Sequence, residues 1–241
     1  MKVFINPTAK ETAVSVTRRL VKALQDTKEE YFHLAISGGS TPSQLFHLWA
    51  NEYADMIAWE KLQLYWVDER CVGPESPESN YGEAKKLFLD RVPLLTTQIH
   101  RIMGENHPIE EAVRYSSMVS VMLPMESGIP IFDMIILGVG NDGHTGSIFP
   151  GQDSLFHYPA GYSHSINPYS GQQRITMTGE TMIRAKTLIF HVVGSGKKEI
   201  TPLVLSNAMT DPTLPASYIS HQARNCEFYI DKLAGELVPE L

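Results

Sequence analysis

Short apolar runs alternate along the chain with longer segments in which apolar residues recur every three or four positions. The runs have the length and the β-branched content of buried parallel strands, whereas the periodic segments have the spacing of amphipathic helices. The predicted strands lie at residues 1–6, 32–36, 62–67, 132–137, 174–178, 187–193 and 226–230. The predicted helices lie at about residues 13–26, 42–49, 84–88, 112–122, around 203–205, from 215 onward, and at 233–237. This alternation predicts an α/β fold, a doubly wound and mostly parallel sheet with helices on both faces.

The chain of 241 residues contains no linker, repeat or low-complexity tract, so residues 1–241 are expected to form a single domain. One polar stretch, Gln152–Gln173, is rich in Gly, Tyr and Ser and is too long to be a plain connection. We expect this stretch to be either a lid or a flexible excursion.

A glycine-rich loop, Gly138–Gly151, follows the predicted strand at 132–137. In open α/β sheets ligands bind at the carboxyl ends of strands, and glycines let the backbone come close to a ligand. The loop places a carboxylate, Asp142, two residues before an imidazole, His144, which favours acid–base catalysis. The alternative is a glycine-rich turn in which Asp142 caps a neighbouring element and His144 lies on the surface. The loop also matches the dinucleotide pattern G-x-G-x-x-G, but a proline and a glycine soon stop any helix, so no nucleotide site is expected.

The predicted strand at 32–36 runs directly into Ser37–Pro42, which has the features of an anion site. Two glycines, hydroxyl side chains and a helix N-terminus direct free backbone N–H groups and a positive dipole end at one place. Thr41 and Gln44 are predicted to form a capping box, with Pro42 at the first helical position. The alternative is an ordinary turn between a strand and a helix.

Two further predicted strands end in charged loops. The strand at 62–67 is followed by Asp68–Arg70, three consecutive charges that are costly to pack unless they pair or meet a ligand. A solvated loop is the alternative interpretation of these three residues. The strand at 187–193 is followed by Gly194–Lys197, again glycines with a cation, while His191 inside that apolar strand is expected to be structural.

The composition narrows the possible partners. A net charge of −7 argues against nucleic acid and anionic membranes, which need a basic face, but it allows a small anion held by a few local cations. The two cysteines, Cys71 and Cys226, lack metal-type spacing, which suggests a reducing compartment without a disulfide framework. The sequence shows no signal-peptide core and no apolar run near the ~20 residues of a membrane span, so a cytoplasmic protein is expected.

Taken together, these loops resemble the 6-phosphogluconolactonase family, the enzymes of the oxidative pentose phosphate pathway. The resemblance implies a Rossmann-like fold that the family shares with glucosamine-6-phosphate deaminases. The motifs that carry it occur in the family's order and spacing and together cover most of the chain. They are Ser37–Pro42, Asp68–Arg70 with Ser79-Asn80, Gly138–Gly151 around Asp142-Gly143-His144, Arg174–Thr176, and Gly194–Lys197.

The resemblance implies a role for each candidate residue. His144 would be the general base that activates water for attack on the lactone carbonyl, and Asp142 would orient the imidazole or hold its tautomer. Asp68 and Arg70 would shape the site and contact the sugar acid. The 6-phosphate would be held by Gly38, Gly39, Ser40, Thr41, Arg174 and Lys197. The expected partner is a small sugar-phosphate lactone, bound by a monomer or a small homo-oligomer, and no residue pattern calls for a metal or an organic cofactor.

Two differences separate the candidate activities. Deaminases of this fold carry a catalytic Glu immediately before the proline of the central loop, where this chain has Phe149, and a Tyr where it has Arg70. Both differences favour hydrolysis of 6-phosphogluconolactone to 6-phosphogluconate over deamination. The alternatives are a glucosamine-6-phosphate deaminase or isomerase and a non-catalytic sugar-phosphate sensor. A sensor would need the phosphate loop but not Asp142, His144 and Arg70 together.

Overall fold

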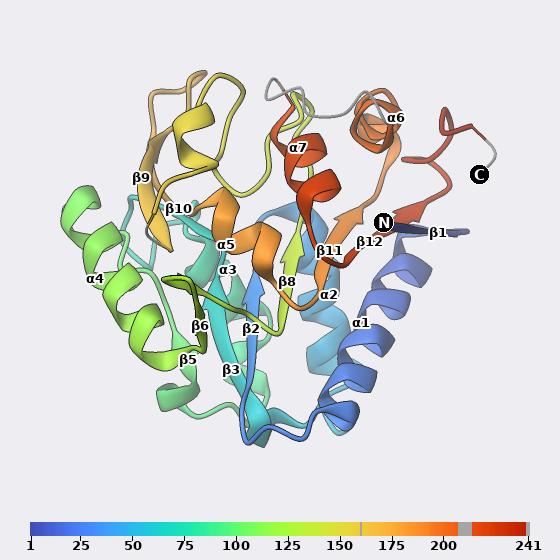
Figure 1. The fold of residues 1–241 in the computed structure, drawn as a ribbon. Helices are drawn as coiled ribbons and strands as arrows, with labels where there is room; N and C mark the ends of the chain where they lie inside the picture. Colours follow the sequence, from blue (N-terminus) through green and yellow to red (C-terminus); the bar gives the residue numbers. More distant parts are fainter. Residues whose placement is uncertain (160, 207–213, 240–241) are drawn as a thin grey trace.

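The computed structural model describes residues 1–159, 161–206 and 214–239, and for Ser40 it describes the backbone alone (Figure 1). Within these residues the centre is a seven-stranded sheet in the order β1-β12-β11-β8-β2-β3-β5, and every neighbouring pair of strands is parallel. The strands are β1 (Lys2–Asn6), β2 (Phe32–Ile36), β3 (Leu62–Trp66), β5 (Ile99–His100), β8 (Met134–Leu137), β11 (Leu188–Val192) and β12 (Cys226–Asp231). The predicted α/β class with a doubly wound sheet is therefore confirmed.

Helices flank the sheet on both faces. The crossovers from β1 to β2 and from β2 to β3 step across the sheet in one direction, and those from β8 to β11 and from β11 to β12 step the opposite way. Because such crossovers are right-handed, α1 and α2 cover one face, and α5, α6 and α7 cover the other (Figure 1). The helices are α1 (Ala9–Asp26), α2 (Ser40–Asn51), α3 (Asn80–Leu87), α4 (Pro108–Met122), α5 (Gly179–Arg184), α6 (Ile200–Leu205) and α7 (Pro215–Gln222). Short 3-10 helices lie at Trp59–Lys61, Leu89–Arg91, Thr96–Gln98, Asp153–Leu155 and Ser195–Lys197.

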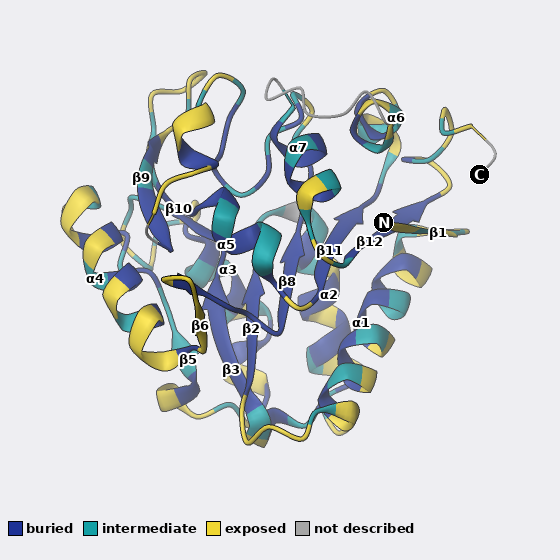
Figure 2. Cartoon of the chain, in the orientation of Figure 1, coloured by how far each residue is buried: buried dark blue, intermediate teal, exposed yellow. Residues whose placement is uncertain are grey.

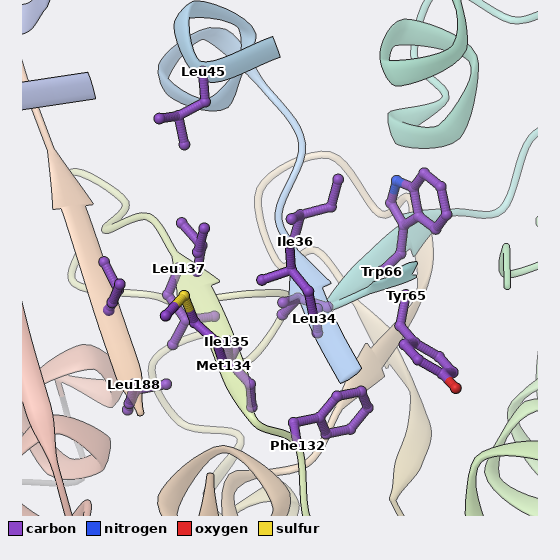
Figure 3. Close-up of a cluster of buried hydrophobic side chains, with 14 of the residues drawn as sticks. Leu34, Ile36, Leu45, Tyr65, Trp66, Phe132, Met134, Ile135, Leu137 and Leu188 are labelled. Atoms are coloured by element: carbon purple, nitrogen blue, oxygen red, sulfur yellow. The ribbon is translucent and has the colours of Figure 1, made fainter. Parts of the chain in front are cut away.

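The central strands are buried on both faces, which explains why they form continuous apolar runs in the sequence. Every residue of β2, β3, β8 and β11 is buried (Figure 2). Leu34 and Ile36 of β2 belong to one cluster with Ile135 and Leu137 of β8 (Figure 3). Close packing around these strands fixes the strand ends from which the polar loops emerge.

A second, antiparallel sheet stands beside the first and has the order β4-β10-β9. Its strands are β4 (Asp68–Arg70), β10 (Gln173–Met177) and β9 (Tyr162–Ile166), and α4 packs against β9 and β10. In the pairing of β10 with β4, Arg174 lies opposite Arg70, so two cations that are distant in sequence become neighbours. A short hairpin of β6 (Met125–Glu126) and β7 (Ile129–Pro130) forms a further sheet.

The polar stretch Gln152–Gln173 is not simply a lid or an excursion, as the sequence suggests, because it contains a 3-10 turn and β9. The sequence does not show this strand, because it contains serines at buried positions. Their hydroxyls can be buried because they donate hydrogen bonds to backbone carbonyls. Ser163 and Ser165 are both buried, and Oγ of Ser165 donates to the carbonyl of Ser147 at 2.5 Å. Hydrogen bonding thus replaces the apolar alternation by which a strand is usually recognised.

The predicted helix at 233–237 is wrong, since residues 232–238 form turns after β12. A carboxylate oxygen of Asp231 accepts from the backbone nitrogen of Ala234 at 2.8 Å, and the carbonyl of Asp231 accepts from Gly235 at 2.9 Å. Leu233 and Leu237 are exposed, so the segment has no buried apolar stripe that would stabilise a short helix.

Candidate active site

A cavity of about 740 Å³ opens at the carboxyl ends of β2, β8 and β11, beside the second sheet. The loops that follow these strands supply most of its lining. Nine of the ten predicted site residues line it, namely Gly38, Gly39, Thr41, Asp68, Arg70, Asp142, His144, Arg174 and Lys197. The tenth, Ser40, begins α2, and its side chain lies outside the described residues.

Glycines in the loop after β8 bring Asp142 and His144 together. The backbone nitrogen of Gly140 donates to the carbonyl of His144 at 2.8 Å, and Gly143 has a φ of 82°, which other residues rarely adopt. A Cβ atom at Gly140 would lie 2.0 Å from Nδ1 of His144, so the position requires glycine. The loop continues as turns as far as Gly151, which shows that the dinucleotide pattern is a false match.

The imidazole of His144 is held by Asp142. Oδ1 of Asp142 lies 2.5 Å from Nδ1 of His144 and accepts from its backbone nitrogen at 3.2 Å. Because an ionised carboxylate can only accept, Nδ1 carries the proton in the neutral ring and Nε2 keeps its lone pair. The side chain of His144 is 32% exposed in the cavity, so water can reach the ring.

The other oxygen of Asp142 is bound by the loop between β9 and β10. Oη of Tyr169 donates to Oδ2 of Asp142 at 2.7 Å. Asn167 shapes this loop, because its Oδ1 accepts from the backbone nitrogens of Tyr169 at 2.9 Å and of Ser170 at 3.3 Å. Burial raises the pKa of Asp142, but the hydrogen bond from Tyr169 and the charge and hydrogen bonds of His144 outweigh it and hold the pKa below its ordinary value. Asp142 is therefore a carboxylate at neutral pH.

Phe149 closes the site behind His144. Its ring centroid lies 4.7 Å from that of the imidazole and 6.4 Å from that of Tyr169, and its side chain is buried. An apolar ring thus stands where deaminases of this fold carry the Glu named above. No carboxylate reaches the cavity from this position.

The carboxylate of Asp68 is tied to the central loop. Oγ of Ser147 donates to Oδ2 of Asp68 at 2.6 Å, and Nη1 of Arg174 lies 3.9 Å from the same oxygen. Nδ2 of Asn80 donates to the backbone carbonyl of Asp68 at 2.8 Å. Asp68 therefore links β4, β10, α3 and the loop that carries His144.

Glu69 stands between two candidate site residues but has a structural role. Its buried carboxylate accepts hydrogen bonds of 2.8 to 3.0 Å from the backbone nitrogens of Arg70, Asn80 and Tyr81 and from Oγ of Ser79. Burial raises its pKa, although these four bonds oppose the rise. Glu69 thereby fixes the start of α3 against β4 and holds its two neighbours at the cavity.

The start of α2 differs from the prediction. The N-cap is Gly39 with a φ of 100°, and α2 begins at Ser40, so Thr41 and Gln44 do not form the predicted capping box. Pro42 becomes the third helical residue rather than the first. Its missing N–H costs nothing there, because the first four N–H groups of a helix have no intrahelical acceptor.

Some of the backbone N–H groups of the loop Ser37–Pro42 already have hydrogen-bond acceptors within the protein. The backbone nitrogen of Gly39 donates to Oε2 of Glu83 in α3 at 3.2 Å. Gly38 packs so closely on α3 that a Cβ atom there would lie 2.1 Å from Oδ1 of Asn80. A carboxylate thus lies at one of the N–H groups that were expected to meet an anion.

The cavity carries more positive than negative charge, although the protein as a whole is acidic. Its lining includes the cations Arg70, Arg174 and Lys197 and the carboxylates Asp68 and Asp142. Nζ of Lys197 donates to Oδ1 of Asn141 at 2.6 Å. Burial lowers the pKa of Lys197, and the charge of Asp142 opposes that fall. This balance of charge favours an anionic ligand.

Several polar atoms of the lining have no hydrogen-bond partner among the described residues. They are Nε of Arg70, Oδ1 of Asn80, Nε of Arg174 and both ring nitrogens of His191. Of eight described residues with such buried atoms, four line this cavity. A buried polar group without a partner costs about 1–3 kcal/mol, so their concentration here favours a polar ligand.

Sequence reasoning assigned no ligand-binding role to several polar residues of the lining, among them Asn80, Tyr169 and His191. Asn80 belongs to the Ser79-Asn80 motif, but the motif gave it no role of its own. Tyr169 reaches Asp142 only because of the β9–β10 hairpin, and the strand pattern around His191 indicates a core residue. These roles depend on contacts between distant segments.

The polar groups of the site are cations, amides, hydroxyls and the Asp142–His144 pair. Among the residues that the structure describes, no three His, Cys, Asp or Glu side chains are grouped as metal ligands would be. In the same part of the chain, no helix has both the length and the apolar character needed to cross a bilayer.

The fold and the site define a class of protein: a doubly wound α/β protein whose cavity combines a carboxylate–imidazole pair with cations for an anionic ligand. The family described as glucosamine-6-phosphate isomerases/6-phosphogluconolactonase matches residues 7–228. A 6-phosphogluconolactonase of Aggregatibacter actinomycetemcomitans is 37% identical over 233 residues, which cover 96% of this chain and 97% of that protein. The chain belongs to the 6-phosphogluconolactonase family, as its motifs predict.

Solved structures agree with this assignment. The crystal structure of a devB protein is 37% identical, has a TM-score of 0.93 and covers 99% of both chains. A monomeric glucosamine-6-phosphate deaminase has a TM-score of 0.83 over 98% of this chain and 100% of its own, at 20% identity. At that identity the likeness concerns the fold alone, which matches the expected relation between lactonases and deaminases.

Proposed function

We propose that this protein hydrolyses 6-phospho-D-glucono-1,5-lactone to 6-phospho-D-gluconate in the oxidative pentose phosphate pathway, with His144 as the general base. The observation that carries the proposal is the 2.5 Å contact between Nδ1 of His144 and Oδ1 of Asp142. It leaves Nε2 as an acceptor in a cavity that water can enter. The names of the relatives supply the substrate.

In the proposed reaction, Nε2 of His144 takes a proton from water as the water oxygen bonds to the lactone carbonyl carbon. Asp142 stabilises the imidazolium that forms, and Tyr169 keeps the carboxylate in place. The negative charge on the former carbonyl oxygen develops in a cavity that carries three cations. When this intermediate collapses, the ring C–O bond breaks, and the imidazolium returns its proton to the ring oxygen.

The phosphate group of the substrate fits the cationic side of the cavity. Lys197 and Arg174 supply charge, while Gly38 and Thr41 lie at the start of α2, whose dipole favours an anion. Gly39 belongs to the same set, but its N–H must exchange its bond with Glu83 for one with the phosphate. Ser40 remains among the proposed phosphate-binding residues on the basis of the sequence motif alone.

The deciding experiment is a lactonase assay on freshly prepared 6-phosphogluconolactone, corrected for spontaneous hydrolysis, beside an ammonia-release assay on glucosamine 6-phosphate. We expect lactone hydrolysis and no deamination, because Phe149 replaces the carboxylate associated with deamination. Ammonia release at a comparable rate would assign the protein to the deaminases. Binding of 6-phosphogluconate without either reaction would make it a sensor.

A further inference from the structure

His191 of β11 is a buried imidazole without a partner. Its side chain is 1% exposed, and neither ring nitrogen has a hydrogen-bond partner among the described residues. The other three cavity residues with an unpaired atom, Arg70, Asn80 and Arg174, each make a polar contact through another atom. Among these four residues of the described lining, His191 is therefore the one whose side-chain nitrogens are all available to bind a ligand.

Two other histidines of the same sheet, the buried His33 and the partly buried His100, show what a structural role requires. Nδ1 of His33 in β2 lies 3.1 Å from Oη of Tyr65, and Nε2 of His100 in β5 lies 2.8 Å from Oε1 of Gln63. Both contacts lie away from the cavity. A histidine kept for packing alone would leave two polar atoms desolvated, which an apolar side chain of similar size avoids.

The position of His191 indicates which part of a ligand it meets. His191 lines the cavity one residue before the end of β11, and the loop that follows this strand carries Lys197. Nζ of Lys197 is held by Asn141, a residue of the loop after β8. His191 therefore belongs to the wall that also carries Lys197, the lysine that we propose binds the phosphate.

His191 is uncharged at neutral pH, and a neutral imidazole can donate a hydrogen bond to a ligand. Burial lowers its pKa to about 4, so the ring is uncharged at neutral pH. A neutral imidazole has one N–H donor and one acceptor nitrogen. A sugar phosphate offers acceptor oxygens on its phosphate and hydroxyl groups that can donate, so it can satisfy both nitrogens.

We propose that His191 is a substrate-binding residue whose ring N–H donates to the phosphate group of the substrate beside Lys197. The proposal rests on the proposed function in one respect, that the ligand is a sugar phosphate. On this proposal, β11 contributes a ligand-binding side chain, His191, in addition to the apolar side chains that pack in the core.

The test compares His191→Leu and His191→Gln with the matched control His33→Leu. Calorimetry measures the Kd of inorganic phosphate and of 6-phosphogluconate, and thermal unfolding measures Tm. We expect His191→Leu to weaken both ligands about 10- to 100-fold, the loss of one hydrogen bond to a charged group. We also expect it to raise Tm by roughly 2–4 °C, because a desolvated polar ring is removed.

The two other variants separate binding from stability. His191→Gln keeps an N–H donor and should lie between wild type and His191→Leu in affinity. His33→Leu should lower Tm, because Oη of Tyr65 loses its partner, and should leave both Kd values unchanged.

Unchanged Kd values in His191→Leu, or equal losses in His33→Leu, would overturn the proposal. A loss for 6-phosphogluconate without a loss for inorganic phosphate would also overturn it, since the contact would then be to the sugar. Failure of the proposed function gives a different result. Wild-type protein would then bind inorganic phosphate through His191 but would not hydrolyse the lactone.

Discussion

Oη of Tyr169 lies 2.7 Å from Oδ2 of Asp142, while Oδ1 of the same carboxylate lies 2.5 Å from Nδ1 of His144. The two oxygens of one carboxylate thus bind the imidazole and a phenol from a different sheet. The hydrogen bond from the phenol stabilises the carboxylate and helps to hold the pKa of Asp142 below its ordinary value.

The first prediction concerns Tyr169→Phe, which removes the hydroxyl and keeps the ring. Loss of this hydrogen bond raises the pKa of Asp142, so the carboxylate that holds the imidazole is protonated at a higher pH. We expect the acid limb of kcat/KM to move upward by less than about one pH unit.

The measurement is the pH profile of kcat/KM, with Tyr31→Phe as the control. Tyr31 is exposed and precedes β2 at the opposite end of the sheet from the cavity. An unmoved acid limb in Tyr169→Phe would show that the hydroxyl does not act through Asp142.

The second prediction concerns His144→Gln, which preserves much of the shape and removes the base. General-base catalysis contributes about 10²–10⁴-fold, so kcat should fall by that factor. The Kd of 6-phosphogluconate should stay near its wild-type value, because the phosphate donors are unchanged. A near-wild-type kcat would remove His144 from the mechanism, and joint loss of rate and binding would show a structural role.

The third prediction concerns Glu83, whose carboxylate accepts the N–H of Gly39 at 3.2 Å. A negative charge at the start of α2 competes with a phosphate for this donor and for the helix dipole. Glu83→Gln should therefore tighten binding of inorganic phosphate by about 2- to 5-fold, a gain typical of one charge at a helix end. The Kd is measured at low ionic strength.

Glu60→Gln is the control for this charge change. Glu60 is exposed in the 3-10 turn before β3, at the amino end of the strand, and should leave the Kd unchanged. Equal tightening in both variants would indicate a general effect of net charge. Weaker binding in Glu83→Gln would show that Glu83 supports the loop instead of competing with the anion.

The fourth prediction concerns Glu111, a buried carboxylate in α4. It accepts from the backbone nitrogen of Met103 at 2.7 Å, from Nδ2 of Asn106 at 3.0 Å and from two nitrogens of Arg114 at 2.6 and 2.7 Å. Burial raises the pKa of Glu111, but these bonds outweigh it and lower the pKa. A carboxyl group with a lowered pKa contributes stability above its unfolded pKa and loses that contribution as pH falls through its folded pKa.

Glu111→Gln should therefore lower the free energy of unfolding by roughly 1–3 kcal/mol at neutral pH. The difference from wild type should shrink as the pH falls below about 4, where the wild-type carboxyl group also becomes neutral. Urea unfolding at several pH values measures this. Glu105→Gln, in a partly exposed pair with Arg101, should cost less than about 1 kcal/mol, and an equal cost would contradict the role of burial.

The apolar runs predicted six of the seven strands of the main sheet, because parallel strands covered on both faces are mostly apolar, whereas the two-residue strand β5 (Ile99–His100) was not predicted. They also located the strand ends, and with them Asp68, Asp142 and Lys197. The class of fold and the place of the cavity were thus readable from local pattern.

The parts that the sequence did not reveal depend on contacts between distant segments. Tyr162–Ile166 forms a strand with buried serines because backbone carbonyls accept their hydroxyls, that of Ser147 in the central loop for Ser165 and that of His164 within the strand for Ser163. The start of α2 is set by Gly39 and its contact with α3, which a local cap at Thr41 could not anticipate. The contact of Tyr169 with Asp142 follows from the hairpin of the second sheet.

The pairing of β1 with β12 has a consequence for synthesis on the ribosome. Lys2 lies opposite Glu227 and Asn6 opposite Asp231, so β1 pairs with a strand that is synthesised long after it. Until β12 leaves the exit tunnel, a nascent chain can assemble β2, β3, β8 and β11, while β1 waits without its neighbour and β11 keeps an open edge. A chain stalled before β12 has emerged would therefore expose two unpaired strands to chaperones and proteases.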